Sequence, residues 1–266
     1  MVDERNSTGR PLASGAWLEA HHRAKRLERN QFAELLATYE PTSVVDIGCA
    51  TGLWLDLLDK VLPPACDFIG LDSDESALAE AKDRSTHWAR RATFEQMDVE
   101  ADFDAIPSAD MTLFFNVFSY LRDPADLLRA LGGRSNHGVV VVRQYDGAAL
   151  RFGPMEMDVR LLVESSLRAS VTSSEQLRHY DMDRVFSLLD ESPFPQRRIE
   201  FELFARTTPF PQEFLDYFEG TLNWTQRHLS EDAANELRRW RRQLVEGPAS
   251  QAYFYEVDLT AVLSWS

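Results

Sequence analysis

A glycine-containing loop between a buried strand and a helix constrains the fold of this chain more than any other feature. The loop, residues 48–52, follows an apolar run at residues 43–47 and precedes a helical pattern that begins at Leu53. A second apolar run, residues 68–71, leads to an acid, Asp72. Strand, helix and strand in this order form a β-α-β unit, so the sequence predicts a parallel sheet.

The alternation of strands and helices continues through the first half of the chain. Further strands are expected at residues 92–98, 111–115 and 139–142, with helical segments between them. Two alternating runs near the end of the chain, residues 198–205 and 251–262, would pair as an antiparallel edge. These patterns predict an α/β fold that is doubly wound, with a mostly parallel sheet.

Helical regions outside this alternation divide the chain further. Residues 1–40 are expected to form an N-terminal helical segment that acts as a lid, and residues 41–266 the main domain. Two helical insertions, at about residues 155–190 and 211–247, would form a helical cap over the carboxyl edge of the sheet. No repeat and no change of composition marks a second independent domain.

The overall composition narrows the classes of function. Acidic residues outnumber Lys and Arg by 43 to 28, and the net charge of −15 disfavours nucleic acid as a partner. No stretch is apolar enough for a signal peptide or a membrane span, so we expect a cytoplasmic protein without a membrane partner. Two cysteines, Cys49 and Cys66, allow no disulfide framework, and no Cys/His spacing resembles a metal site. The apolar strands at the end of the chain and the N-terminal helix would suit a homodimer.

The carboxyl ends of the strands carry the informative residues, because ligands of open α/β sheets bind there. In the loop, Gly48 and Gly52 allow the backbone to approach a ligand closely. A carboxylate at Asp72 can accept hydrogen bonds from both hydroxyls of a ribose. Asp98 and Val99 suit an adenine, since the acid accepts from the exocyclic amine and the apolar side chain covers the ring. The three strand ends together predict a nucleoside pocket.

These residues resemble those of the class I S-adenosylmethionine-dependent methyltransferases. The resemblance rests on residues 45–52 (VDIGCATG), 70–72 (GLD), 97–99 (MDV) and 110–116 (DMTLFFN). It covers roughly residues 40–145 and implies a Rossmann-like, seven-stranded sheet whose last strand is antiparallel. It also implies S-adenosylmethionine as the cofactor and methyl transfer as the reaction.

The same resemblance implies which residues hold the cofactor. The loop would hold its amino-acid part, Asp72 its ribose, and Asp98 would face its adenine. The cofactor-binding residues expected on this basis are Asp46, Gly48, Cys49, Ala50, Gly52, Asp72, Ser73, Asp98, Val99 and Asn116. We expect Cys49 to be a small packing residue and not a nucleophile, because the methyl acceptor in this chemistry is the substrate.

Nicotinamide-dependent enzymes share the ribose acid and are the competing class. They prefer a three-glycine loop that opens directly into the helix, whereas Ala50 fills the middle position here. The loop, together with its spacing to Asp72, therefore favours a methyltransferase.

The acceptor side is predicted from residue type alone. His179 and Tyr145 are the catalytic candidates, with His179 as a general base, although a half-exposed helix histidine would look the same in the sequence. His21 or His22 would supply the base instead if the N-terminal helix folds over the cofactor. The residues expected to bind the substrate are Trp17, Tyr120, Arg143, Arg178 and Tyr180.

The expected function is methyl transfer to the oxygen, nitrogen or carbon of a small-molecule acceptor, because an extended cap leaves little access for a polymer. The resemblance favours a secondary metabolite as that acceptor. Two alternatives stay open: a protein that binds S-adenosylmethionine but acts as a cyclase, or one that acts as a regulator. The aromatic residues Phe214, Tyr217 and Phe218 would wall a substrate pocket or, as we favour, form the buried stripe of the inserted helix.

Overall fold

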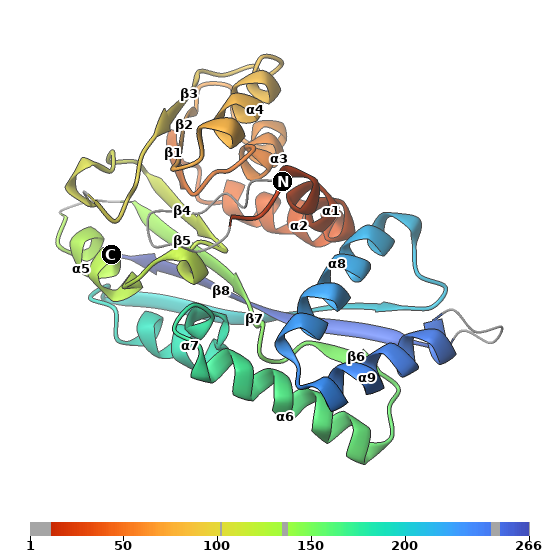
Figure 1. Ribbon diagram of the computed structural model, residues 1–266. Coiled ribbons are helices and arrows are strands. Elements are labelled where there is room, and N and C mark those ends of the chain that lie inside the picture. The colour runs from red at the N-terminus through yellow and green to blue at the C-terminus, as the bar shows by residue number, and fades with distance from the viewer. Residues whose placement is uncertain (1–11, 102, 135–137, 246–250, 266) are drawn as a thin grey trace.

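The computed structural model describes residues 12–101, 103–134, 138–245 and 251–265. Its strands form one eight-stranded sheet with helices packed against both faces (Figure 1). The strands are β1 (Ser43–Ile47), β2 (Asp67–Asp72), β3 (Ala92–Gln96), β4 (Met111–Phe115), β5 (Val139–Tyr145), β6 (Arg151–Gly153), β7 (Gln196–Thr207) and β8 (Tyr253–Ser264). The longer helices are α1 (Gly15–Ala24), α2 (Arg26–Ala37), α3 (Leu53–Val61), α4 (Glu75–Ser85), α5 (Pro124–Gly132), α6 (Met157–Ser173), α7 (Met182–Asp190), α8 (Gln212–His228) and α9 (Glu231–Trp240). Short helical turns are η1 (Phe103–Ala105), η2 (Phe118–Tyr120), η3 (Arg178–Tyr180) and η4 (Arg241–Val245).

The strand order across the sheet is β3-β2-β1-β4-β5-β8-β6, with β7 paired to the other edge of β8. The first five strands are parallel, and β8 runs antiparallel to β5, β6 and β7, so the predicted fold class and the antiparallel last strand are confirmed. The predicted number of seven strands was one too few. Residues 258–264 of β8 pair with β5, and β6 pairs with residues 253–255, where backbone groups of β8 would otherwise lack partners.

Strand β5 extends to Tyr145, three residues beyond its predicted end at residue 142. The last three residues of β5 pair with residues 258–260 of β8. An antiparallel neighbour therefore lengthens the strand, and Arg143 and Tyr145 lie within it and not in a loop after it.

The N-terminal helical segment consists of two helices that meet at Lys25. The backbone of Lys25 leaves the helical range, with φ −106° and ψ 19°. Its side chain is only 1% exposed, and its Nζ lies 2.9 Å from Oδ1 of Asp258 on β8. A buried ammonium group requires a partner charge, and the turn between α1 and α2 directs this one to the sheet.

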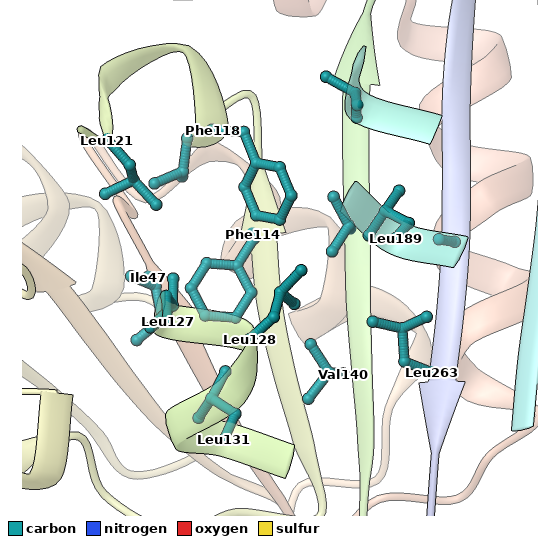
Figure 2. Packing of buried hydrophobic residues seen from close by; sticks show 14 of the residues in the cluster. Ile47, Phe114, Phe118, Leu121, Leu127, Leu128, Leu131, Val140, Leu189 and Leu263 are labelled. Carbon is teal, nitrogen blue, oxygen red and sulfur yellow. The ribbon is translucent and has the colours of Figure 1, made fainter. Parts of the chain in front are cut away.

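Three hydrophobic clusters form the core. The first lies between the sheet and helices α5 and α7, where Phe114 and Val140 pack against Leu128 and Leu189 (Figure 2). The second lies on the opposite face of the sheet, under α2, α3 and α4. The third joins α6, α8 and α9 to the ends of the antiparallel strands. Phe214, Tyr217 and Phe218 of α8 are buried in this third cluster, which confirms that they form the buried stripe of the inserted helix.

Helix α8 lies beside the N-terminal helices, and α6 and α9 pack together along β8 (Figure 1). Trp17 of α1 reaches α8 at Gly220, where a Cβ atom would lie 2.1 Å from Cζ3 of the indole. A helix normally disfavours glycine, so the missing side chain here makes room for Trp17.

Within the part of the chain that the structure describes, no helix combines the length and the apolar character needed to cross a membrane. The same residues contain no group of three or more His, Cys, Asp or Glu side chains arranged to hold a metal ion.

Candidate active site

A cavity of about 500 Å³ lies at the carboxyl ends of the parallel strands. Its walls include the residues that follow β1, β2, β3 and β4, together with the end of β5. Helix α1 contributes a further wall through Trp17, Leu18 and His21. The cavity is therefore placed where an open α/β sheet binds its ligands, with the N-terminal helix over it.

The loop after β1 is shaped by three residues with left-handed backbone conformations: Gly48, Ala50 and Gly52, with φ of 70°, 46° and 75°. At Gly48 a Cβ atom would lie 2.7 Å from Cγ2 of Val117, so both the conformation and the packing require glycine. Gly52 ends the loop as the N-cap of α3. The loop is thus compact and presents its backbone to the cavity.

Asp72 at the end of β2 fixes this loop from the side. Its Oδ2 accepts a hydrogen bond of 2.8 Å from the backbone N–H of Ala50, and its Oδ1 accepts one of 2.9 Å from the N–H of Asp74. Burial raises the pKa of Asp72, although these two hydrogen bonds oppose the effect. The carboxylate lines the cavity with each oxygen already oriented by one donor, and each still has capacity to accept another.

Asp46 lies behind the loop and is 2% exposed. Its Oδ2 has no hydrogen-bond partner among the described residues. Burial raises the pKa of Asp46 well above its ordinary value, and the charge of Asp72 raises it further. Asp46 is not among the residues that line the cavity.

The residues after β3 form the wall beside Asp72. Oδ1 of Asp98 accepts a hydrogen bond of 3.1 Å from the N–H of Glu100, which orients the carboxylate. Val99 is buried, and the side-chain amide of Gln96 donates to the carbonyl of Ser73 at 3.0 Å. Asp98 is therefore an oriented acid next to the apolar side chain of Val99. The hydrogen bond between Gln96 and Ser73 joins the end of β3 to the end of β2.

The opposite end of the cavity contains three tyrosines. The side chains of Tyr120 and Tyr145 both hydrogen-bond to Tyr180, and the rings of Tyr145 and Tyr180 lie 5.2 Å apart. Burial raises the pKa of Tyr120 and of Tyr145 well above the ordinary value, and proximity to Tyr180 adds to the shift. Asn116, with φ 60°, accepts a hydrogen bond of 3.2 Å from the N–H of Tyr145. Because their pKa values are raised, the hydroxyl groups of Tyr120 and Tyr145 remain neutral.

Helix α1 covers this end with a histidine and a tryptophan. The ring of His21 stacks on Tyr217 at 4.8 Å and 11°, and Trp17 stacks on the same tyrosine at 5.2 Å. Tyr145 meets the His21 ring edge-on at 6.4 Å. His21 is 6% exposed, and its Nε2 has no hydrogen-bond partner among the described residues.

A buried cation, Arg29 of α2, also lines the cavity. Its Nη1 lies 3.0 Å from Nδ1 of His22, and its guanidinium lies over the ring of Trp54 at 4.9 Å. Its Nε has no hydrogen-bond partner among the described residues. Burial and then the charge of Arg143 lower the pKa of Arg29 to about 10, so the side chain is still cationic at neutral pH.

An ion network behind the cavity ties α1 and α8 to β8. Lys25 forms ion pairs with Glu256 and Asp258, and Arg143 binds Asp258 at 2.6 Å. The hydroxyl of Tyr217 donates to Glu256 at 2.6 Å. These pairs are buried, so the network fixes the position of the helices that cover the cavity.

Comparison with known protein families identifies the kind of domain that these residues form. Residues 45–140 match the profile of a family described as methyltransferase domain. The matched segment begins at β1 and includes the loop, Asp72, Asp98 and Asn116. These residues form a class I S-adenosylmethionine-dependent methyltransferase domain.

Two of the solved structures similar to this chain have TM-scores above 0.5 and share its fold. YcgJ from Bacillus subtilis has a TM-score of 0.52 at 12% identity, and the match covers 90% of this chain and 99% of that one. Phosphoethanolamine N-methyltransferase 2 of Haemonchus contortus, solved with S-adenosyl-L-methionine, has a TM-score of 0.51 at 16% identity, over 90% of this chain and 53% of that one. The plantazolicin methyltransferase BpumL matches with a TM-score of 0.47 at 20% identity, over 91% and 85%. No curated protein sequence matches the chain significantly.

Most of the residues predicted for the cofactor meet in this cavity. The lining residues from that prediction are Gly48, Cys49, Ala50, Asp72, Ser73, Asp98, Val99 and Asn116. The two others do not line the cavity: Asp46 lies in β1, and Gly52 ends the loop that follows it. Burial raises the pKa of the Cys49 thiol well above its ordinary value, which agrees with a packing residue.

The residues predicted for the acceptor are divided between the cavity and other places. Trp17, Tyr120, Tyr145 and Tyr180 line it. Three others are absent from the lining. Arg143 is buried in ion pairs with Asp258 and Glu202, and Arg178 binds Glu175 at 2.9 Å and the carbonyl of Arg122. His179 is 2% exposed and lies in η3, so it is not the half-exposed helix histidine of the alternative interpretation.

The sequence reasoning did not select Arg29, which the structure brings into the cavity. A signal was present, because Arg29 lies on the same helical stripe as Phe32 and Leu36, where an apolar residue would be expected. A charged residue on a buried stripe needs a partner or a ligand. Recognising Arg29 would have required knowledge of what the stripe faces.

Proposed function

We propose that the chain binds S-adenosylmethionine in this cavity and transfers its methyl group to a small, uncharged acceptor molecule. The observation that carries the proposal is the carboxylate of Asp72, which lines the cavity with both oxygens oriented by backbone donors. A carboxylate held in this way can accept from both hydroxyls of a ribose. The donor supplies a methyl group bonded to a positively charged sulfur, which is already activated for transfer.

The residues at the donor end fit the other parts of this ligand. Asp98 and Val99 offer an acceptor and an apolar cover for an adenine. Arg29 offers a buried cation with an unpartnered Nε, which suits the carboxylate of the amino-acid part. The backbone of Ala50 and of its neighbours in the loop lines the cavity between these groups. The charges are therefore complementary along the length of the ligand.

The acceptor end supports a small molecule. Its walls are Trp17, His21, Tyr120 and Tyr180, which come from helices and turns, and Tyr145 at the end of β5. An aromatic pocket with a few polar groups is typical of small-molecule sites. The residues here exclude water and hold the acceptor near the donor, which is the main requirement for transfer from an activated methyl group. Neither Arg143 nor Arg178 is assigned to substrate binding, since both are engaged elsewhere.

The proposal is tested by calorimetric titration with S-adenosylhomocysteine. We expect Asp72→Ala to weaken binding by about 1.5–3 kcal/mol, because hydrogen bonds to a charged group are lost. Asp67→Ala is the matched control: the same strand begins there, and among the described residues its carboxylate forms an ion pair with the exposed Arg91. Equal affinities in the wild type and Asp72→Ala would remove the ribose assignment.

A second titration tests Arg29 separately. Arg29→Gln should weaken the binding of S-adenosylhomocysteine but not of 5′-methylthioadenosine, which has the nucleoside and no carboxylate. If both ligands lose affinity equally, Arg29 does not hold the carboxylate. If the wild type binds neither ligand, the proposed function is wrong as a whole.

A further inference from the structure

Strand β7 forms one edge of the sheet. It pairs with β8 along its whole length, residues 196–207, and no other described strand pairs with its opposite side. The carbonyl of Val257 on β8 accepts a hydrogen bond from the N–H of Asp146, just after β5, so its register partner Leu203 directs its own N–H and C=O away from β8. Backbone donors and acceptors are therefore left at a free edge, which is a template for another strand.

The side chains along this edge include large apolar groups in contact with water. Leu203 is 64% exposed, and Phe201, on the same face of the sheet, is 56% exposed. Phe201 stacks on the exposed Phe186 of α7, with ring centroids 6.2 Å apart. The charged residues of β7 are of both signs: Arg197, Arg198, Glu200, Glu202 and Arg206. The edge therefore does not share the excess of acids that gives the whole chain a net charge of −15 and repels a second copy elsewhere.

The order of charges along β7 makes the strand complementary to itself in one register. In an antiparallel pair of identical strands, the two-fold axis passes beside one residue, which then lies opposite itself. Like charges in opposite positions are destabilising. An axis at Glu200 or Glu202 places that acid opposite itself, and an axis at Phe201 places Glu200 opposite Glu202. An axis at Leu203 avoids these clashes and places Glu200 opposite Arg206.

We infer that β7 is a self-association surface, and that its occupant is β7 of a second copy of the chain in the antiparallel register centred on Leu203. Residues 199–207 of the two copies form the ladder, and Leu203, whose backbone groups point to the free edge, exchanges hydrogen bonds with its counterpart. Phe201 then packs opposite the small side chain of Ala205, and the two-fold axis forms the pair of Glu200 and Arg206 twice. A single strand gives a small interface, so the dimer is reversible. The inference is independent of the proposed function.

Sedimentation velocity of the full chain, over a range of concentrations, tests the association. The wild type should pass from monomer to dimer as the concentration rises. Leu203→Glu should raise the dissociation constant about tenfold or more, because it places an acid opposite itself and removes apolar contact. Leu161→Glu is the matched control: this leucine of α6 is 60% exposed, similar to Leu203, but lies outside β7, so the variant should dimerise as the wild type does.

Cysteine variants test the register. Leu203→Cys should form a disulfide with its counterpart under mild oxidation, because a hydrogen-bonded pair in a ladder places the Cα atoms about 5.5 Å apart. Phe201→Cys lies opposite Ala205 in this register and should cross-link much less, as should Leu161→Cys. Non-reducing electrophoresis measures the linked dimer. The two native cysteines are buried and should give no background.

Three results would overturn the inference. The first is a wild-type chain that stays monomeric at every concentration, and the second is a dimer that Leu203→Glu leaves intact. The third is a disulfide that forms at Phe201→Cys or Leu161→Cys in preference to Leu203→Cys, since the contact would then use another register or another face. Circular dichroism shows whether Leu203→Glu is folded. If it is not, the cross-link at Leu203→Cys decides the question in folded protein.

Discussion

The two ends of the cavity are built in different ways. Apart from Arg29 of α2, the proposed donor end comes from the ends of consecutive strands between residues 45 and 116, where hydrogen bonds to Asp72 and Asp98 hold the loops in place. The acceptor end joins α1, η2, η3 and the end of β5, which are far apart in the chain. The donor end is acidic, whereas the acceptor end is aromatic, with buried cations next to it.

This difference means that the two proposed ends depend on different sets of contacts. The donor end depends on the sheet, whose topology fixes where the strand ends meet. The acceptor end depends on how helices outside the sheet dock, through Lys25, Trp17 and Tyr217. Substitutions in the docking contacts should therefore affect the acceptor end and leave the donor end intact.

The largest expected effect is on the docking itself. Lys25→Met should lower the free energy of unfolding by about 3–5 kcal/mol, because Glu256 and Asp258 lose the cation that partners them in the core. Urea unfolding followed by circular dichroism measures the change. Lys60→Met is the control: its ion pair with Asp56 is exposed and should be worth less than about 1 kcal/mol. If both variants lose equal stability, the network does not hold the helices as we describe.

The next effect tests the donor end. Gly48→Ala should cost about 2–4 kcal/mol in stability or donor affinity, because φ is 70° and the new Cβ atom would meet Val117 at 2.7 Å. Titration with S-adenosylhomocysteine and thermal unfolding together measure it. Gly133→Ala is the control, since φ is −73° there and the nearest atoms are at ordinary contact distance. A Gly48→Ala protein with normal affinity and stability would contradict the role of the loop.

The third effect tests the acceptor end with the same kind of change. Gly220→Ala should cost about 1–3 kcal/mol, because its Cβ atom would collide with Trp17 and displace the indole. Donor affinity should stay the same, in contrast to Gly48→Ala, while methyl transfer falls. Trp17→Leu should relieve the collision, so the double variant should be more stable than the sum of the single changes predicts. Simple additivity would show that Trp17 does not occupy this space.

The smallest effect concerns Asp146, which lies beside the segment that carries Tyr180. Burial raises its pKa to about 6 from an ordinary value of 3.8, and Asp181 and Asp183 add to the shift. Because the folded state holds the proton more tightly, ionisation destabilises the fold as the pH rises from about 4 through 6. Asp146→Asn should therefore gain about 1–2 kcal/mol above pH 6 and nothing below about pH 4. A gain that is the same at all pH values would contradict this explanation.

The donor end was largely predictable from the sequence. A strand that stops at a small-residue loop, followed by an acid after the next strand, is a local pattern, and residues 45–52 and Asp72 meet because adjacent parallel strands end at the same edge. The lengths of β5 and of the N-terminal helices were less predictable. The antiparallel partner β8 extends β5 to Tyr145, and the ion pair of Lys25 with Asp258 divides the helical segment, so both depend on contacts between distant parts of the chain.

Local periodicity and strand order were enough to predict the fold class, and the resemblance of the strand ends to those of methyltransferases implied the cofactor and most of the residues at the donor end. Only the tertiary structure decided which polar residues face the acceptor. Arg29, His21 and His179 all look alike in the sequence as polar residues of helical segments, yet the first two line the cavity and the third does not. The physical reason is that a helix exposes different faces to different neighbours, and the docking of α1 and α2 against β8 and α8 selects the face.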